Sequence, residues 1–199
     1  LIIGGGAIDR QMEETLRRFP NSVWSTYGMT ETLSHIALRK LSGPEASGWY
    51  TPFKDVTVSL SDENTLIIRA PRVNAETLTT NDIAELNPKG QFRIIGRKDN
   101  TINTGGVKVQ IEQIEEALHA RLSLPFMITA VPDPKFGERI VMLTEGEPQM
   151  KEIEKAVSTL PPYWRPKQVF KTEKLPQTGT GKPDRAEARR LAEDIAARI

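Results

Sequence analysis

The chain has 199 residues, 38% of them hydrophobic, with 27 basic and 26 acidic side chains and no cysteine. This length allows one large domain or two small ones, and the balanced charge argues against bulk binding to nucleic acid or an acidic membrane. The lack of cysteine excludes disulfides and thiolate metal sites, two histidines argue against a histidine-based zinc site, and no apolar run approaches the ~20 residues of a membrane span.

No signal peptide is visible, so the sequence predicts a cytoplasmic protein. Residues 1–3 are expected to form a short strand, 9–18 a helix and 23–27 a second strand, an order that indicates an α/β layer. The chain opens on an apolar run with no initiator Met, as if inside a buried strand. We therefore expect a fragment of a longer protein.

A small antiparallel or barrel-like subdomain is predicted next. Residues 55–60 and 65–70 alternate apolar and polar side chains, and Asp62-Glu63-Asn64 between them is a plausible hairpin turn. Residues 92–96 are expected to form another strand. Residues 97–106 are polar, bear glycine and show no periodicity, so they are the candidate domain boundary.

The remainder of the chain predicts a small α+β domain. The pattern favours helices over 111–118, 150–160 and 183–199, with strands over 127–131, 140–143 and 169–171. Pro183 is expected at the favoured first position of the last helix.

The most informative stretch is the turn from Thr26 to Thr32. The aromatic face of Tyr27 can stack on a purine, and Gly28 lets the backbone approach a ligand closely. The hydroxyl of Thr30 can reach a phosphate oxygen, and the carboxylate of Glu31 can hold Mg²⁺. Together these groups indicate a nucleotide triphosphate site.

Four short segments give this site its context. They are Gly5-Gly6-Ala7, Tyr27-Gly28-Met29-Thr30-Glu31, Gly96-Arg97-Lys98-Asp99 and Leu175-Pro176-Gln177-Thr178-Gly179-Thr180-Gly181-Lys182. In this order and spacing they resemble the acyl-adenylate-forming (AMP-binding) superfamily of acyl-CoA synthetases, peptide-synthetase adenylation domains and luciferases. The resemblance extends from Gly4 to Arg185.

The resemblance implies the C-terminal part of an adenylate-forming fold. Residues 1–97 would end the large AMP-binding domain, with an α/β layer and the barrel-like subdomain. Residues 98–199 would form a small, mobile α+β domain. In this family a carboxylic acid attacks the α-phosphate of ATP to give acyl-AMP and pyrophosphate, the small domain rotates, and a thiol, usually that of coenzyme A, takes the acyl group. ATP, Mg²⁺, coenzyme A and a carboxylic acid are the implied ligands.

The resemblance also implies roles for residues before the boundary. ATP or AMP would be contacted by Gly6, Ala7, Tyr27, Gly28, Thr30, Asp82 and Arg97. Tyr27 would stack on adenine, Glu31 would hold Mg²⁺ and Asp82 would accept both ribose hydroxyls. The alternatives are that Tyr27 packs in the core, Glu31 caps a helix and Asp82 is an ordinary loop residue. Asn81 departs from the glycine of the family but tolerates a left-handed backbone.

Further roles fall on the second part of the chain. Asp99 matches the hinge of the family, although an Arg-Lys-Asp run is often only a solvated surface. Gly105, Gly106 and Lys108 would line the coenzyme A tunnel, or simply form a tight turn. Lys182 is the expected catalytic residue, because its charge would offset negative charge in the transition state. The alternatives are a surface lysine or another phosphate loop, although a Walker spacing is absent.

The motifs also indicate a subfamily and a missing part. The runs from Gly96 and from Thr104 look like those of o-succinylbenzoate–CoA ligases of menaquinone biosynthesis, in which Thr32, Ser34 and His35 could line the acyl pocket. His35 could equally be an ordinary, partly buried histidine. The phosphate loop of the family should precede Gly4, so we expect the chain to need a missing N-terminal part and to be unable to form acyl-AMP alone.

Other readings stay open. The chain could belong to another acyl-CoA synthetase or to an adenylation domain that loads a carrier protein. It could also be a non-catalytic module derived from the superfamily. Retention of Glu31, Asp82, Arg97 and Lys182 argues against a degenerate module. A homo-oligomer is possible.

Overall fold

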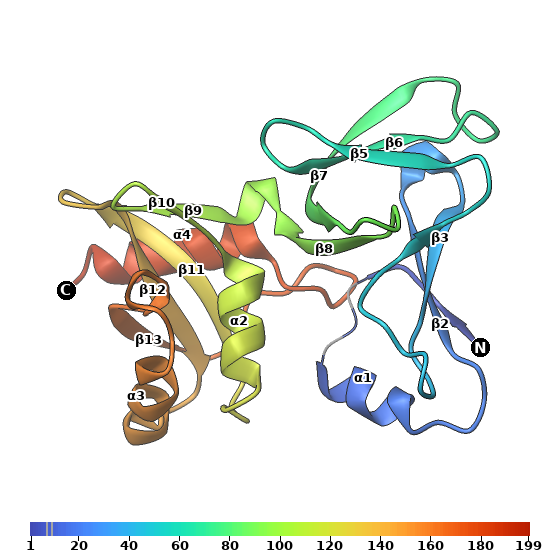
Figure 1. The fold of residues 1–199 in the computed structure, drawn as a ribbon. Helices are drawn as coiled ribbons and strands as arrows, with labels where there is room; N and C mark the ends of the chain where they lie inside the picture. Colours follow the sequence, from blue (N-terminus) through green and yellow to red (C-terminus); the bar gives the residue numbers. More distant parts are fainter. Residues whose placement is uncertain (7, 9) are drawn as a thin grey trace. The chain divides into compact units, whose positions relative to one another are not determined.

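The computed structural model describes residues 1–6, 8 and 10–199 and contains two compact units, residues 1–99 (unit 1) and 100–199 (unit 2) (Figure 1). The division lies next to the boundary expected at residues 97 and 98. Within the described residues, no helix is both long enough and apolar enough to cross a membrane.

Unit 1 begins with the expected α/β layer. Strand β1 (Ile2–Ile3) pairs in parallel with β2 (Trp24–Gly28), and helix α1 (Arg10–Arg17) connects them. Strands β3 (His35–Lys40) and β4 (Thr51–Pro52) extend the sheet in antiparallel fashion. Beneath the helix, the buried side chains are Leu16, Val23 and Leu41.

The second sheet of unit 1 is an antiparallel meander, which confirms one of the two expected forms. Its strands, in order, are β5 (Thr57–Leu60), β6 (Thr65–Arg69), β7 (Thr77–Leu86) and β8 (Phe92–Arg97). The hairpin turn expected at residues 62–64 is present, with Asn64 at a φ of 61° and the Ser61 amide donating to the Thr65 carbonyl over 2.9 Å.

Strand β7 was missed by the sequence analysis. Because its polar Thr-Thr-Asn-Asp centre hides the alternation, no strand was expected there. Asp82 lies within this ten-residue strand, so the alternative of an ordinary loop residue is not observed. The strand also bulges: Thr65 pairs with Ile83 and Ile67 with Thr79, so two steps along β6 face four along β7. Asn81 does not have the positive φ that was considered for it.

The two sheets of unit 1 share one core. Its fully or nearly buried members are Ile36, Ala37, Leu66, Ile68, Ala70, Ala84 and Phe92. A pair of backbone hydrogen bonds joins the sheets directly, because the Tyr50 amide donates to the Phe92 carbonyl over 2.7 Å and the Phe92 amide donates back over 3.1 Å.

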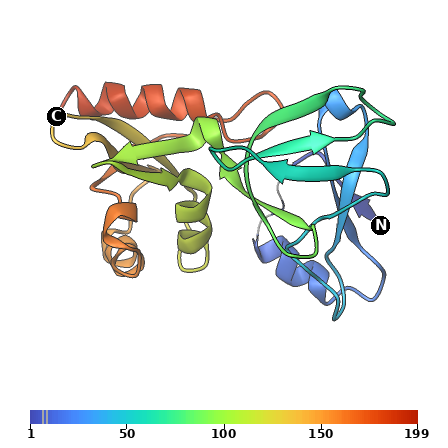
Figure 2. The same cartoon turned by 45° about the horizontal axis from the view of Figure 1, so that its top comes forward.

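Unit 2 is a sheet covered by helices on both faces (Figure 2). Strand order is β10-β9-β12-β11, and β13 pairs in parallel with β12. The strands are β9 (Thr101–Thr104), β10 (Val107–Gln110), β11 (Phe126–Asp133), β12 (Gly137–Glu145) and β13 (Gln168–Thr172). The helices are α2 (Ile111–His119) and α3 (Met150–Ser158) on one face and α4 (Arg185–Ala196) on the other.

Alternation along β11 explains this layering. Ile128 and Ala130 point to the cluster under α2 and α3, whereas Met127 and Val131 point to the cluster under α4. A strand buried on both faces reads as a nearly continuous apolar run, which is why residues 127–131 were recognised as a strand.

The division between the units, after Asp99, lies within the boundary expected at residues 97–106. That stretch is nevertheless regular, because it includes the end of β8, a 3-10 turn at Lys98–Asn100 and the β9 strand of a hairpin. The expected start of the last helix was wrong. Helix α4 does not start at Pro183, since Pro183 bridges to Gln177 instead. Asp184 is the N-cap of α4, and its side chain accepts from the Glu187 amide. Two further 3-10 turns lie at Thr30–Thr32 and Pro162–Trp164.

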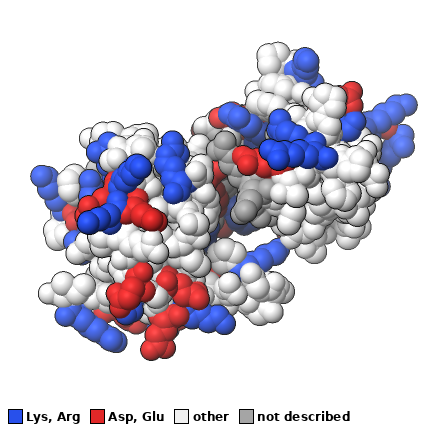
Figure 3. All heavy atoms as spheres, turned by 90° about the horizontal axis from the view of Figure 1, so that it is seen from below, with Lys and Arg blue, Asp and Glu red and all other residues white. Residues whose placement is uncertain are grey.

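Charged side chains of both signs lie on the face in Figure 3, in keeping with 27 basic and 26 acidic residues. Helix α4 carries several exposed ion pairs, such as Arg190 with Glu187. Surface pairs of this kind contribute little to stability.

The two-residue β9–β10 turn yields a stability prediction. Gly105 and Gly106 both have positive φ, 60° and 81°, as a type I′ turn requires. Gly105→Ala and Gly106→Ala should each lower the free energy of unfolding by roughly 1–2 kcal/mol, because a side chain is strained there. Urea denaturation measures this. Gly179→Ala, where a Cβ meets open space and φ is not positive, should change little; equal losses in all three variants would contradict the argument.

Candidate active site

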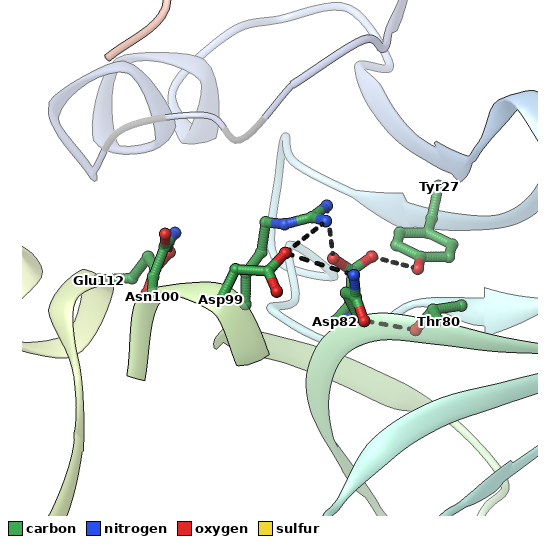
Figure 4. Close-up of polar contacts among 8 residues, drawn as sticks. Tyr27, Thr80, Asp82, Asp99, Asn100 and Glu112 are labelled. Atoms are coloured by element: carbon green, nitrogen blue, oxygen red, sulfur yellow. Dashed lines mark hydrogen bonds and ion pairs between the residues drawn. The ribbon is translucent and has the colours of Figure 1, made fainter. Parts of the chain in front are cut away.

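Two of the residues that the sequence assigned to nucleotide binding are in contact. The Tyr27 hydroxyl on β2 donates to Asp82 Oδ2 on β7 over 2.5 Å, although the two residues are 55 apart in sequence (Figure 4). The Asp82 amide in turn donates to Thr80 Oγ1 over 3.1 Å. The bulge in β7 is what turns this part of the strand away from its regular pairing with β6.

The second oxygen of Asp82 continues the network. Arg97, opposite Asp82 on β8, places Nη1 3.3 Å from Oδ1. Asp99 Oδ2 lies 3.5 Å from Arg97 Nη2 and accepts from Asn81 Nδ2 over 3.3 Å. The Asp82 side chain is 16% exposed and that of Arg97 is 51% exposed, so a carboxylate and a guanidinium lie at the surface of unit 1 side by side.

Tyr27 packs in the core, as the structural alternative expected, and its hydroxyl also contacts another predicted nucleotide-binding residue. Its ring is half-buried, edge-on to Phe92 with centroids 5.0 Å apart and tilted against Tyr50 at 5.8 Å. Burial, together with the hydrogen bond to Asp82 and the charge of Asp82, raises the pKa of the Tyr27 hydroxyl. The hydroxyl therefore stays protonated and acts as a donor to Asp82.

The turn after β2 depends on Gly28 in a way that the sequence analysis did not foresee. A Cβ on Gly28 would lie 2.5 Å from the Ser34 carbonyl oxygen, so the glycine permits close approach of the chain to itself. Thr32 is fully buried, and its hydroxyl accepts from the Met29 amide over 3.0 Å and lies 2.8 Å from the Ser34 carbonyl. The Thr32 hydroxyl therefore holds the turn, and the predicted pocket-lining role of Thr32 remains a prediction.

Other predicted residues of this turn face solvent. Thr30 and Glu31 are exposed, and the Glu31 carbonyl accepts from Asn74 Nδ2 over 3.1 Å. The cap of this 3-10 turn is made by Met29 and Thr32, so the alternative of Glu31 as a cap is not observed. Gly6 is exposed after β1, and Ala7 lies outside the described residues.

His35 and Ser34 are both exposed. The His35 side chain lines a pocket of about 240 Å³ in unit 1, together with Phe53 and the ion-paired Arg72. The predicted pocket role of His35 and Ser34 remains a prediction.

In unit 2 the predicted coenzyme A residues lie on one hairpin. Gly105 and Gly106 form its turn, and Lys108 is exposed on β10. The Gly105 amide donates to the Phe136 carbonyl over 2.9 Å, and a Cβ on Gly105 would lie 3.2 Å from the Phe136 ring. The tight-turn interpretation therefore holds, and it does not conflict with a tunnel role.

Lys182 lies on a closed hairpin rather than on an open loop. We call residues 176–184 the Lys182 hairpin. Within it the Thr178 amide donates to the Lys182 carbonyl over 2.8 Å, and the Gly181 amide donates to the Thr178 carbonyl over 2.9 Å. The Asp184 amide closes the base by donating to the Pro176 carbonyl over 3.0 Å. The Lys182 side chain is exposed at the tip.

A buried carboxyl lies next to the start of unit 2. Glu112 on α2 accepts from Asn100 Nδ2 through one oxygen, while its Oε2 is buried without a hydrogen-bond partner (Figure 4). Burial raises the pKa of Glu112. The sequence did not predict this pair, because a polar residue at each of the two positions is not a signal by itself.

The side chains suit an adenosine phosphate. The carboxylate of Asp82 can accept vicinal hydroxyls, the guanidinium of Arg97 can pair with a phosphate, and exposed Glu31 can contribute one oxygen to Mg²⁺, which usually takes one or two carboxylates plus substrate phosphates. Among residues 1–6, 8 and 10–199, three or more acidic or histidine side chains do not converge, so a site built entirely from protein ligands is not formed there.

Gly28 provides a test of the turn. Gly28→Ala should lower the free energy of unfolding by about 1–3 kcal/mol, because the added methyl overlaps the Ser34 carbonyl. Thermal unfolding followed by circular dichroism measures the loss. Gly48→Ala, where a Cβ meets open space and φ is not positive, is the matched control. A Gly28 variant as stable as the control would rule out the close approach.

Glu112 predicts a pH dependence. Its folded pKa is raised, so its contribution to stability is present below its unfolded pKa of about 4.3 and is lost as pH rises through the folded value. Glu112→Gln stays neutral and should melt at a higher temperature than the parent chain at neutral pH, with the difference vanishing towards pH 4. The control is Glu116→Gln, exposed on the same helix. A difference independent of pH would contradict this assignment.

Comparison with known proteins provides independent evidence about the relatives of this chain. No protein-family model matches the chain. It is 28% identical to the 2-succinylbenzoate–CoA ligase of Bacillus cereus (strain ATCC 10987), with 98% of the chain and 47% of the relative aligned. It is 27% identical to that of Salmonella typhimurium, with 77% and 36% aligned. The chain thus spans less than half the length of these curated relatives.

A solved structure supports the fold. The Bacillus subtilis o-succinylbenzoate CoA synthetase, in complex with the acyl-adenylate intermediate, matches with a TM-score of 0.80 and 20% identity over 97% of this chain and 45% of that one. These findings confirm the resemblance predicted from the motifs: the chain is a homologue of the 2-succinylbenzoate–CoA ligases and other AMP-binding acyl-CoA ligases, and it has their adenylate-forming fold.

Proposed function

We propose that this chain forms part of an ATP-dependent acid–CoA ligase, which converts a carboxylic acid to acyl-AMP and then to acyl-CoA. The observation that carries the proposal is the contact between Tyr27 and Asp82, with Arg97 beside them. These three residues come from different motifs, each of which predicted a nucleotide contact, and they converge on one surface of unit 1. Relatives whose names make them ligases of acids to coenzyme A support the same chemistry.

In this proposal unit 1 holds the nucleotide. Asp82 accepts the two ribose hydroxyls, and Tyr27 orients the carboxylate through its hydroxyl while its partly exposed ring meets the adenine. Arg97 pairs with ribose or phosphate oxygens. Thr30 contacts the α-phosphate, and Glu31 holds Mg²⁺, which when bound neutralises phosphate charge.

Unit 2 supplies Lys182 and the coenzyme A contacts. The Lys182 ammonium offsets the negative charge that develops as the acid attacks the α-phosphate. Asp99, the last residue of unit 1, is the hinge about which the small domain turns between the two half-reactions. After that turn the hairpin with Gly105, Gly106 and Lys108 faces the thiol substrate. The domain assignment, 1–97 and 98–199, is part of the proposal.

The acid is proposed to be o-succinylbenzoate, which would place the reaction in menaquinone biosynthesis and the protein in the cytoplasm. Two relatives in different bacteria, 27% and 28% identical to this chain, carry the name of that ligase. Ser34 and His35 are the proposed contacts in the part of the acyl pocket that this chain supplies. The phosphate loop and the remaining pocket wall are proposed to come from a preceding segment.

The experiment is a ligation assay on a protein in which this chain follows such a segment. We expect o-succinylbenzoate, ATP and coenzyme A to give the thioester and AMP, while the 199-residue chain alone shows no ATP–pyrophosphate exchange. AMP formation without consumption of coenzyme A would favour a carrier-protein acceptor instead. Failure of all tested acids to give AMP would refute the ligase.

Lys182 gives the sharper arm of this test. Lys182→Ala should lower the rate of acyl-AMP formation about 100-fold or more, as loss of a transition-state contact does. It should leave thioester formation from supplied acyl-AMP nearly unchanged. Lys174→Ala, an exposed lysine on the same segment, is the control.

A further inference from the structure

The Lys182 hairpin is fixed at its base. On the entering side Leu175 is buried under α4, and its amide donates to Glu145 Oε2 over 3.2 Å. On the leaving side Asp184 caps α4 and closes the hairpin through Pro176. Between these points the residues are exposed, so the position of Lys182 depends on what holds the two legs.

Arg185 holds the leaving leg. It is the first residue of α4, three residues after Lys182, and its guanidinium makes a two-bond contact with Glu115 on α2, with Nη1–Oε1 and Nη2–Oε2 both at 2.6 Å. The side chains are 23% and 12% exposed. A parallel fork of this kind fixes direction as well as distance.

Glu115 is in turn fixed by the sheet. Its Oε1 also accepts from the Ile128 amide of β11 over 2.8 Å, so one carboxylate joins α2, β11 and α4. Burial opposes the charge of Arg185, but the hydrogen bonds and charge of Glu115 outweigh it, and the pKa of Arg185 is raised. The Arg185 guanidinium thus stays charged although it is largely buried. The Arg190–Glu187 pair of the same helix, by contrast, is exposed.

We propose that Glu115, through Arg185, is a positioning residue that sets where the Lys182 hairpin presents its ammonium. This inference rests on the proposed role of Lys182 in acyl-AMP formation. The path is short: Lys182 is separated from Arg185 by Pro183, whose φ is restricted, and by Asp184, whose amide is already bonded. A shift of Arg185 would therefore also shift the Lys182 hairpin.

The variants separate positioning from mere stability. Glu115→Gln keeps an oxygen for the Ile128 amide but loses the ionic fork, and Arg185→Lys keeps the charge but cannot make two parallel bonds. Arg190→Lys, in an exposed pair of the same helix, is the matched control. If Glu115→Gln does not fold, Arg185→Lys carries the test.

The first readout is hydrogen exchange on the 199-residue chain, which needs no activity. The Gly181 and Lys182 amides are bonded to Thr178. We expect both fork variants to exchange faster across residues 177–183, with the protection of β11 and β12 retained and the control unchanged. Unchanged exchange in the hairpin would overturn the proposal.

The second readout is the two half-reactions in the longer protein. The fork variants should slow acyl-AMP formation about 10–100-fold, as small misplacements of a reacting group do, and leave thioester formation from supplied acyl-AMP within about twofold. In a Lys182→Ala background they should add no further loss, because a residue acting through Lys182 has nothing left to position. Equal losses in both half-reactions, no loss in either, or losses that multiply with Lys182→Ala would overturn it. If Lys182→Ala itself has no effect, the proposed function fails instead.

Discussion

The hydrogen bond between the Tyr27 hydroxyl and the Asp82 carboxylate joins the two sheets of unit 1 at the site. The Tyr27 ring lies in the shared core against Phe92, so the hydroxyl is held by the same packing that stabilises the unit. Because burial raises the pKa of this hydroxyl, it remains a donor. This contact holds one oxygen of Asp82, while the other oxygen pairs with Arg97, which is also paired with Asp99.

The strands that carry Tyr27 and Asp82 both have irregular pairing near these residues. The bulge in β7 releases Asp82 from its regular place, and a second irregularity between Tyr27 and Gly28 sets the end of β2. Bulges often re-aim side chains next to functional sites. Here each bulge lies at a residue that the motifs assigned to the nucleotide, which links the local geometry to the proposed chemistry.

Unit 2 uses a comparable device. Glu115 joins a helix, a strand and the residue that follows the Lys182 hairpin, and its partner Arg185 is 70 residues away in the chain. A buried, fully bonded ion pair adds less to stability than its geometry suggests, because desolvation offsets the attraction. The main effect of this ion pair is geometric, because it fixes the start of α4 relative to the sheet.

Periodicity predicted the elements that are buried on one or both faces. Residues 127–131 and 140–143 of the central strands, the three helices of unit 2 and the hairpin at residues 62–64 were all found from it. Periodicity failed to predict strands in which polar side chains make specific contacts, because such strands do not alternate apolar and polar residues. Strand β7 has a Thr-Thr-Asn-Asp centre, and the β9–β10 hairpin carries two glycines and few apolar side chains, so both looked like loops.

The sequence by itself determined the family resemblance and the residue types of the site, because short motifs carry their chemistry in order along the chain. It could not decide that Tyr27 both packs on the core and orients Asp82. Nor could it decide that the Thr32 hydroxyl is hydrogen-bonded within the turn, or that Glu115 forms an ion pair with Arg185. Those contacts join positions far apart in the chain. They depend on strand register, bulges and sheet packing, and these are fixed only when the whole unit folds.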